Sequence, residues 1–188
     1  MRTTKTRTFC NALLTLSILF GTGPAPANQT AMPYAGQEQR AVKALSEDEI
    51  KSFLGGSGTG HARAAELNSY PGPMHVIELA ERLGLSEAQL AAMRELMHAH
   101  KAEARQLGAE VVRLERELDA LFASRSATTA AVEAKAREAG IALARYRASH
   151  LTTHIAATRL LEPAQVERYS ELRGHRGGTA HEAGKHHH

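Results

Sequence analysis

The sequence has little cysteine, few aromatic residues and no long hydrophobic run. Its 188 residues include one Cys and no Trp, and only 4% are aromatic although 43% are hydrophobic. So few aromatic side chains argue against the thick core of a β-sandwich or an α/β enzyme and favour a helical protein. No segment of the sequence approaches the roughly 20 apolar residues that span a bilayer, so we expect no stable membrane insertion.

The chain also lacks a charge excess outside its first 27 residues. These residues carry Arg2, Lys5 and Arg7 and no acid, which leaves 20 basic and 20 acidic residues in the remainder. A balanced surface offers no electrostatic footprint for nucleic acid, so we expect no nucleic-acid partner. The adjustable charges are the eleven histidines.

The N-terminus is organised like a secretory signal peptide. A basic stretch over residues 1–8 precedes an apolar run over 9–20, and Ala25-Pro26-Ala27 is an A-x-A cleavage sequence. We expect residues 1–27 to be removed after Ala27 on export across the inner membrane. Cys10 would leave with them, so the mature chain would have no disulfide and no thiolate ligand.

Glycine, proline and capping residues divide the mature chain. Residues 28–45 show no periodicity and are predicted to be a flexible linker. Residues 46–72 are predicted to be a short helical segment, with helices over 47–54 and 61–67 on either side of a glycine-rich hinge. Residues 174–188 are polar and rich in Gly and His, and are expected to form a disordered tail.

Residues 73–173 are predicted to form one helical domain. After a short helix over 73–83, apolar positions in alternating steps of three and four mark a helix of 38 residues from Ser86 to Ala123. A polar turn over 124–129 precedes a second seam, namely Val132, Ala136, Ala139, Leu143, Tyr146, His150, Thr153, Ala157 and Leu160. Two such seams joined by a short turn predict an all-α fold, a long antiparallel helical hairpin with short flanking helices.

Histidines occupy matching heights on this predicted hairpin. With the turn centred near residue 125, His100 lies level with His150 and His98 with His154. His100 and His150 are also seam residues, so their rings should face each other. His150 and His154 are one helical turn apart, a spacing that lets two imidazoles reach one ion. With His75 from the short helix before the hairpin, three or four nitrogen donors could converge on zinc, nickel, cobalt or copper.

The same histidines have a simpler interpretation, as polar seam residues that hydrogen-bond each other or Thr153 and set the register. His98 is one step off the seam and should face solvent. Met93 and Met97 are expected in the core, although a thioether can bind copper(I). The chain has no G-x-S-x-G or H-E-x-x-H motif and its mature part no cysteine nucleophile, so we expect neither an enzyme nor an organic cofactor.

Two five-residue motifs, Leu85-Ser-Glu-Ala-Gln89 and Leu161-Glu-Pro-Ala-Gln165, resemble the paired LTxxQ-type motifs of the Spy/CpxP superfamily of bacterial periplasmic proteins. Ser86 and Glu162 stand where threonine is usual. The resemblance covers residues 73–173 and implies a helical hairpin that dimerises. Members act as ATP-independent chaperones, as inhibitors of envelope-stress sensor kinases, or as metal sensors in the heavy-metal-sensor and zinc-resistance-associated branches.

In the metal-sensing branch, a ligand histidine precedes the proline of the second motif by about ten residues, and further ligands come from the first short helix. Here His154 lies nine residues before Pro163, and His75 lies in the first short helix. The resemblance therefore implies that these two histidines belong to a metal site, with an offset of about one residue from the family pattern.

These observations predict a periplasmic, non-enzymatic homodimer that senses or buffers a divalent transition metal through His75, His100, His150 and His154, in envelope stress or metal resistance. The alternative is an ATP-independent chaperone that binds unfolded envelope proteins without a metal. A third interpretation, an adaptor that docks on a membrane sensor protein, is not separated from these by sequence.

Overall fold

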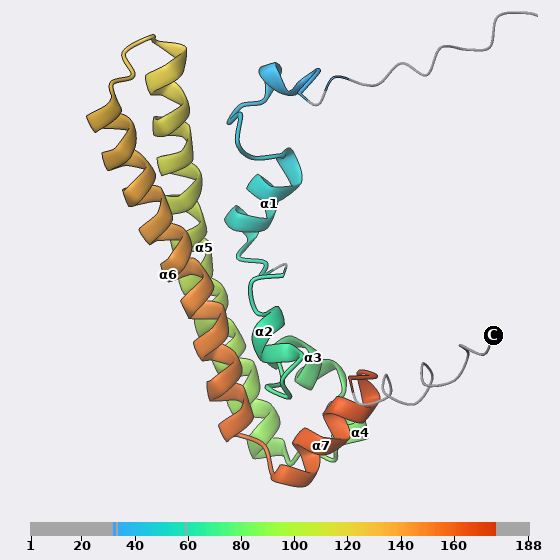
Figure 1. Ribbon diagram of the computed structural model, residues 1–188. Coiled ribbons are helices and arrows are strands. Elements are labelled where there is room, and N and C mark those ends of the chain that lie inside the picture. The colour runs from blue at the N-terminus through green and yellow to red at the C-terminus, as the bar shows by residue number, and fades with distance from the viewer. Residues whose placement is uncertain (1–31, 33, 59, 176–188) are drawn as a thin grey trace, which may run out of the picture. The chain divides into compact units, whose positions relative to one another are not determined.

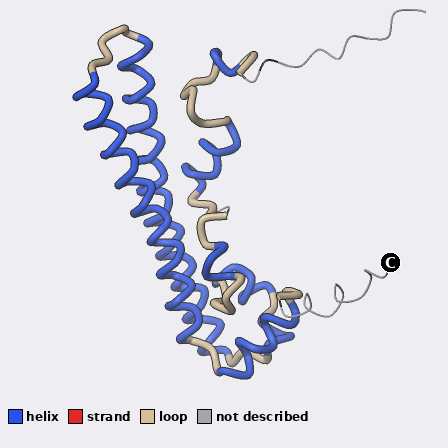
Figure 2. Tube along the Cα trace, viewed as in Figure 1, coloured by secondary structure: helices blue, strands red, loops and turns tan. Residues whose placement is uncertain are grey.

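The computed structural model describes Met32, residues 34–58 and residues 60–175. Within them the chain is all-α and contains no β-strand (Figures 1 and 2). The helices lie in one compact unit that begins at Gly36. They are η1 (Gln37–Gln39), α1 (Glu47–Gly55), α2 (Arg63–Glu66), α3 (Pro73–Glu78), α4 (Ala80–Leu83), α5 (Glu87–Ala123), α6 (Thr129–Arg159) and α7 (Pro163–Leu172). The predicted signal peptide and nearly all of the predicted tail lie outside the described residues.

Two long helices, α5 and α6, make up about half of the described residues of this unit, and each begins at a capping residue. The Ser86 hydroxyl accepts a hydrogen bond from Gln89 N, and the Gln89 side chain accepts one from Ser86 N, which is the predicted capping box. The Thr128 hydroxyl accepts from Ala131 N at the start of α6. Arg125, in the turn, has a positive φ of 57°. The predicted helix and turn are confirmed to within one residue.

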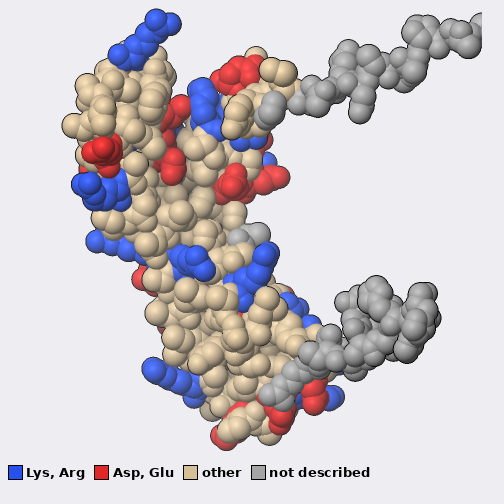
Figure 3. Space-filling view, viewed as in Figure 1, with Lys and Arg blue, Asp and Glu red and all other residues tan. Residues whose placement is uncertain are grey.

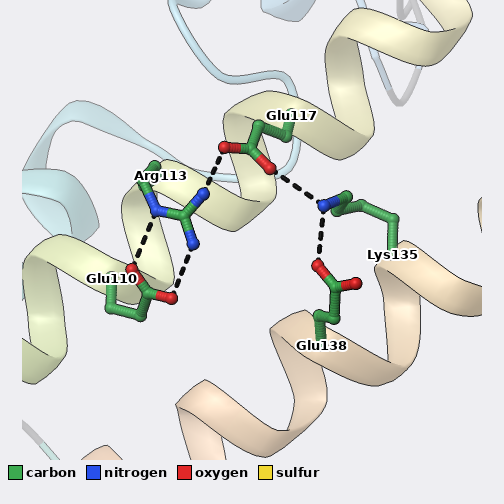
Figure 4. Close-up of polar contacts among 5 residues, drawn as sticks. All are labelled: Glu110, Arg113, Glu117, Lys135 and Glu138. Atoms are coloured by element: carbon green, nitrogen blue, oxygen red, sulfur yellow. Dashed lines mark hydrogen bonds and ion pairs between the residues drawn. The ribbon is translucent and has the colours of Figure 1, made fainter.

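Contacts between α5 and α6 occur at both ends of the pair, which lie side by side in Figure 1. Next to the turn, Lys135 donates to Glu117 over 2.9 Å, and at the far end Gln89 donates to Leu160 O over 3.0 Å. Figure 4 shows the ion pairs that surround the first contact, which also involve Glu110, Arg113 and Glu138. Because most of these side chains are 40% or more exposed and Lys135 is 23% exposed, each ion pair contributes little to stability.

Both long helices bury apolar side chains, and those of α6 are mostly alanines. The buried apolar residues are Met93, Ala104, Val111, Val112 and Leu114 on α5 and Ala139, Ala142, Tyr146 and Ala157 on α6. The predicted second seam is wrong at Ala136, which is exposed, and at Leu143, which is 39% exposed; Ala142 lies inside in place of Leu143. Steps of three then four and steps of four then three both lead from Ala139 to Tyr146, so the seven-residue spacing alone does not choose between Ala142 and Leu143.

Residues 36–45 are part of the fold, so the predicted flexible linker over 28–45 is wrong for its second half. Val42 is 0% and Leu45 9% exposed, and both belong to a cluster with Phe53 of α1 and Val111 of α5. Two apolar residues three positions apart are too few to reveal a period in the sequence. Their burial depends on α5, far along the chain.

A second apolar cluster lies at the other end of α5 and α6. Sequence predicts one helix over 73–83, but Leu79 ends α3 and begins α4 with φ −100° and ψ 11°. Both short helices contribute a buried side chain, Val76 and Leu83, to a cluster that also contains Met93, Ala157, Leu161 and Tyr169. The predicted last helix, after Glu162, is present as α7 and packs here too.

The two five-residue motifs, residues 85–89 and 161–165, meet beside this cluster. The Gln89 amide nitrogen donates to Gln165 Oε1 over 2.9 Å, and the Gln165 amide nitrogen donates to Gln89 Oε1 over 3.2 Å. The same oxygens accept the backbone N–H groups of Ser86 and Glu162, at 3.0 Å and 2.9 Å. Each motif therefore caps its own helix and binds the other motif.

Candidate functional site

The four histidines predicted as metal ligands line one cavity of about 520 Å³. His100 reaches it from α5, His150 and His154 from α6, and His75 from α3. The rest of the wall comes mainly from residues 56–74, the segment to which sequence assigns a glycine-rich hinge and a short helix. The cavity therefore lies where that segment covers the two long helices.

His100 and His150 are in ring-to-ring contact across α5 and α6, as their matching heights predict. Their ring centroids are 4.5 Å apart with the planes at 89°, and the residues are 8% and 4% exposed. His150 also packs on Tyr146, with ring centroids 4.5 Å apart. A Cβ at Gly58 would lie 2.1 Å from His150 Cδ2. Only a residue without a side chain can lie on this ring, which explains one glycine of the hinge.

On α6, backbone carbonyls set the tautomers of both predicted ligands. His150 Nδ1 lies 2.9 Å from Tyr146 O, and His154 Nδ1 lies 2.7 Å from Tyr70 O. A carbonyl oxygen only accepts, so in each neutral ring Nδ1 carries the hydrogen and Nε2 carries the lone pair. His150 Nε2 is buried and has no hydrogen-bond partner.

The other two rings, His75 and His100, also donate from Nδ1 to an oxygen. His75 Nδ1 lies 2.9 Å from Glu78 Oε2, a carboxylate that accepts. His100 Nδ1 lies 3.4 Å from Ser149 Oγ, whose hydrogen is used in a 2.9 Å bond to Glu103 Oε2, so the ring donates to the hydroxyl. Metal-binding histidines typically donate one ring N–H to a carbonyl or carboxylate and use the other nitrogen as ligand. His75, His150 and His154 have this arrangement, whereas His100 donates to a hydroxyl, and in all four rings Nε2 carries the lone pair.

Burial keeps the deepest two imidazoles neutral. Removal from water, followed by the nearby His150, lowers the pKa of His100 to about 4. Removal from water also lowers the pKa of His150, against the opposing effect of its bond to the Tyr146 carbonyl. A metal ion binds the unprotonated Nε2 of a neutral ring. Near pH 7 an ion that binds His100 or His150 would therefore displace no proton.

The four rings are not gathered around one point. Among the residues that the structure describes, no three His, Cys, Asp or Glu side chains stand close enough to hold a single ion. Met97 lines the cavity, whereas Met93 is fully buried in the apolar cluster. His98 is exposed and outside the cavity wall, as expected from its place off the seam. Binding of one ion by three of these rings therefore requires movement of the side chains or of residues 56–74, which cover the long helices.

Glu66 and His175 also line the cavity, and sequence analysis assigns neither a role. Glu66 lies in α2, a helix of four residues, and Tyr169 OH donates to its Oε1 over 2.5 Å. His175 follows α7 and places Nε2 3.9 Å from the same oxygen. No pattern in the sequence marks either residue, because α2 is too short to show a period and His175 lies in the predicted tail.

Comparison of the chain with protein-family models, with curated proteins and with solved structures gave no match. Along the described chain, no helix has the length and apolar character that crossing a membrane requires. Acidic and basic side chains are interspersed on the face drawn in Figure 3, in keeping with the balanced composition.

Proposed function

We propose that this chain is a periplasmic, non-enzymatic protein of Spy/CpxP type that senses or buffers a divalent transition metal. The observation that carries the proposal is the arrangement of His75, His100, His150 and His154, which line one cavity with Nδ1 held by an oxygen and Nε2 available. Imidazole nitrogen is a preferred ligand of zinc, nickel, cobalt and copper.

The finer fold proposal is an antiparallel helical hairpin that forms a homodimer. Contacts between Lys135 and Glu117 beside the turn, and between Gln89 and Leu160 at the far end, support the hairpin. The reciprocal bonds of Gln89 and Gln165 support kinship with proteins that carry two LTxxQ-type motifs. Dimerisation, export with cleavage after Ala27, and the absence of enzymatic activity stay predictions.

Metal binding would act on the fold by joining segments. His75 belongs to α3, whereas His100 and the other two belong to α5 and α6. An ion held by rings from both parts would draw the short N-terminal helices against the long pair, and the energy of binding would stabilise that arrangement. A change in how these helices pack is a signal that a partner can detect.

Calorimetric titration with Zn²⁺, Ni²⁺, Co²⁺ and Cu²⁺ tests the proposal. The chain used carries asparagine in place of His181, His186, His187 and His188, so that these residues contribute no binding. We expect a Kd tighter than about 10 μM for at least one metal, weakened at least about 10-fold by the double substitution His150→Ala and His154→Ala.

His98→Ala is the matched control, because His98 is exposed and outside the cavity wall. Its affinity should equal that of the parent chain, and circular dichroism should show that all variants stay helical. Absence of binding tighter than 10 μM, or equal binding by the double variant and the control, would remove the metal-sensor proposal.

The chaperone function stays the second candidate because α6 exposes apolar side chains. Ile141, Leu143 and Ile155 are 48%, 39% and 40% exposed, and Phe122 at the end of α5 is 58% exposed. Such side chains can hold unfolded segments weakly without a cofactor. Suppression of client aggregation that persists in the double histidine variant, in a chain that binds no metal, would favour this function.

A further inference from the structure

Helix α6 carries a second apolar seam on the side opposite its contact with α5. The seam follows alternating steps of three and four residues and consists of Ile141, Ala144, Ala148, Leu151 and Ile155. At about 100° per residue, these positions lie roughly 140–180° around the helix from Tyr146, which is fully buried. Ile141 and Ile155 are 48% and 40% exposed. The helix therefore has two apolar faces, and the described residues cover one of them.

Helix formation alone does not explain the isoleucines of this seam. A β-branched side chain loses rotamer freedom in a helix, so exposed helical positions favour Ala, Glu, Lys or Arg over Ile. Ile141 and Ile155 lie two heptads apart, about 21 Å along the helix axis, and Leu151 lies between them. Alternating steps of three and four over this length are the pattern on which a second helix packs.

The charged side chains beside the seam are arginines. Arg145 and Arg147 flank the seam between Ala144 and Ala148, and Arg159 follows Arg145 by two heptads. Coiled coils form ion pairs between helices at these flanking positions. The three arginines are exposed, and in the part of the chain that the structure describes none of them forms an ion pair. Their guanidinium groups are therefore available to a partner.

No acidic side chain of α6 neutralises these arginines. Residues 139–161 contain no Asp or Glu, although the chain beyond residue 27 is balanced in charge. Glu110 of α5 borders the same shallow pocket as Arg145, but Arg113 binds both of its carboxylate oxygens. This side of α6 is therefore apolar along its centre and cationic along its edges, which suits a partner surface with apolar and acidic side chains.

A second copy of this face and a lipid surface fit it less well. Two copies of residues 139–161 would bring arginines together with no acid to pair them. Helices that lie on an anionic bilayer bury large side chains such as Trp, Phe and Leu, whereas the middle of this seam consists of Ala144 and Ala148. Two alanines one turn apart let the backbone of another helix approach closely. The chemistry therefore favours a helix with acidic edges.

We propose that the outer α6 face, formed by the five seam residues with Arg145, Arg147 and Arg159, binds an acidic amphipathic helix of a partner protein. The partner helix packs apolar residues along the seam over about four turns and places Asp or Glu opposite the arginines. This inference goes beyond the proposed function, because none of these residues lines the histidine cavity and no metal takes part.

Calorimetric titration of the full chain with two synthetic peptides, in the presence of a chelator, tests the inference. Both peptides span about four heptads with Ile and Leu at the seam positions, and they differ only in carrying Glu or Lys at the flanking positions. Like charges at these positions keep each peptide from pairing with itself. We expect the Glu peptide to bind at least about 10-fold more tightly than the Lys peptide, and less tightly as the salt concentration is raised.

Reversal of the arginine charges should reverse this preference. In the double variant Arg145→Glu and Arg147→Glu, the Lys peptide should bind more tightly than the Glu peptide. The matched control is the double variant Arg94→Glu and Arg116→Glu, which makes the same change in net charge at exposed positions of α5. The control should keep the preference of the parent chain for the Glu peptide.

Replacement of the isoleucines tests the apolar seam. The double variant Ile141→Gln and Ile155→Gln should bind the Glu peptide at least about 10-fold more weakly than the parent chain. Phe122→Gln, at an aromatic residue of α5 that is 58% exposed, should bind it as the parent chain does. Because all of these positions are exposed, circular dichroism should show the same helix content in every variant.

Equal binding of the two peptides, no binding of the Glu peptide, or a preference unchanged by the arginine double variant would overturn the inference. Sedimentation of the chain with vesicles of phosphatidylglycerol and phosphatidylcholine, lost in the isoleucine variant, would overturn it in favour of a membrane. A dimer that the isoleucine variant converts to a monomer would overturn it in favour of a second copy. Peptide binding that persists in the double variant His150→Ala and His154→Ala supports the inference, whatever the outcome of the metal titrations.

Discussion

His100 shows how a single buried ring links the stability of the fold to pH. Its pKa falls from an ordinary 6.5 to about 4 in the folded chain, chiefly through burial. The facing groups are His150, with its own lowered pKa, and Ser149, with Glu103 behind it. Between pH 6.5 and 4 the unfolded chain therefore binds more protons than the folded one, and stability falls as the pH is lowered through this window.

We expect His100→Gln to remove this pH dependence in part. Without metal, the parent chain should lose on the order of 2 kcal/mol of unfolding free energy through His100 as the pH falls from 7 towards 4. The variant should be less stable at pH 7 but lose less over the same range. Urea denaturation in the presence of a chelator, at several pH values, measures both slopes. His98→Gln, at an exposed position, should show the same pH dependence of the unfolding free energy as the parent chain. If the unfolding free energy of His100→Gln falls with pH as steeply as that of the parent chain, His100 is not the source of the pH dependence.

Two helical glycines allow a matched test at the scale of the elements. A Cβ at Gly108 in α5 would lie 2.0 Å from Phe53 O, a backbone atom of α1, whereas a Cβ at Gly140 in α6 would have nothing within 4 Å. Alanine is the better helix former, so Gly140→Ala should stabilise the chain by about 0.5–1 kcal/mol. Gly108→Ala should destabilise it by about 1–3 kcal/mol, because α1 must move away from α5.

Urea denaturation of the two variants measures this difference directly. The two changes in unfolding free energy should have opposite signs, whereas helix propensity alone predicts that both substitutions stabilise the chain. Equal stabilisation by the two alanines would mean that α1 does not lie against Gly108 in solution.

At the same scale, the long helices and the short helices over 47–54 and 61–67 could be predicted, but the way in which residues 56–74 pack on the long pair could not. Seams of alternating three and four residues mark α5, and the count about residue 125 places His100 against His150, which are in contact. The roles of Gly58 and Glu66 depend on atoms more than 80 positions away in sequence, such as the His150 ring and Tyr169 OH. A helix of four residues is too short to show a hydrophobic period in the sequence. A ring that packs on a glycine is likewise not indicated by any sequence pattern other than the glycine itself.

For the unit as a whole, the two five-residue motifs at residues 85–89 and 161–165 join the start of α5 to the start of α7. Gln89 and Gln165 exchange amide hydrogen bonds at 2.9 Å and 3.2 Å across 76 positions of sequence. Each glutamine also completes the capping box of its own helix. The local capping bonds of one motif survive the loss of the other motif, whereas the bonds between the motifs do not.

A double-mutant cycle of Gln89→Ala and Gln165→Ala separates these two effects. Each single substitution should cost about 1–2 kcal/mol of unfolding free energy, from the lost cap and the lost pair. The double variant should be more stable than the sum of the two losses predicts, by about 0.5–1.5 kcal/mol, because the bonds between the motifs are lost only once. Urea denaturation of the four chains gives this coupling energy. A coupling of zero would mean that the motifs act only as separate helix caps.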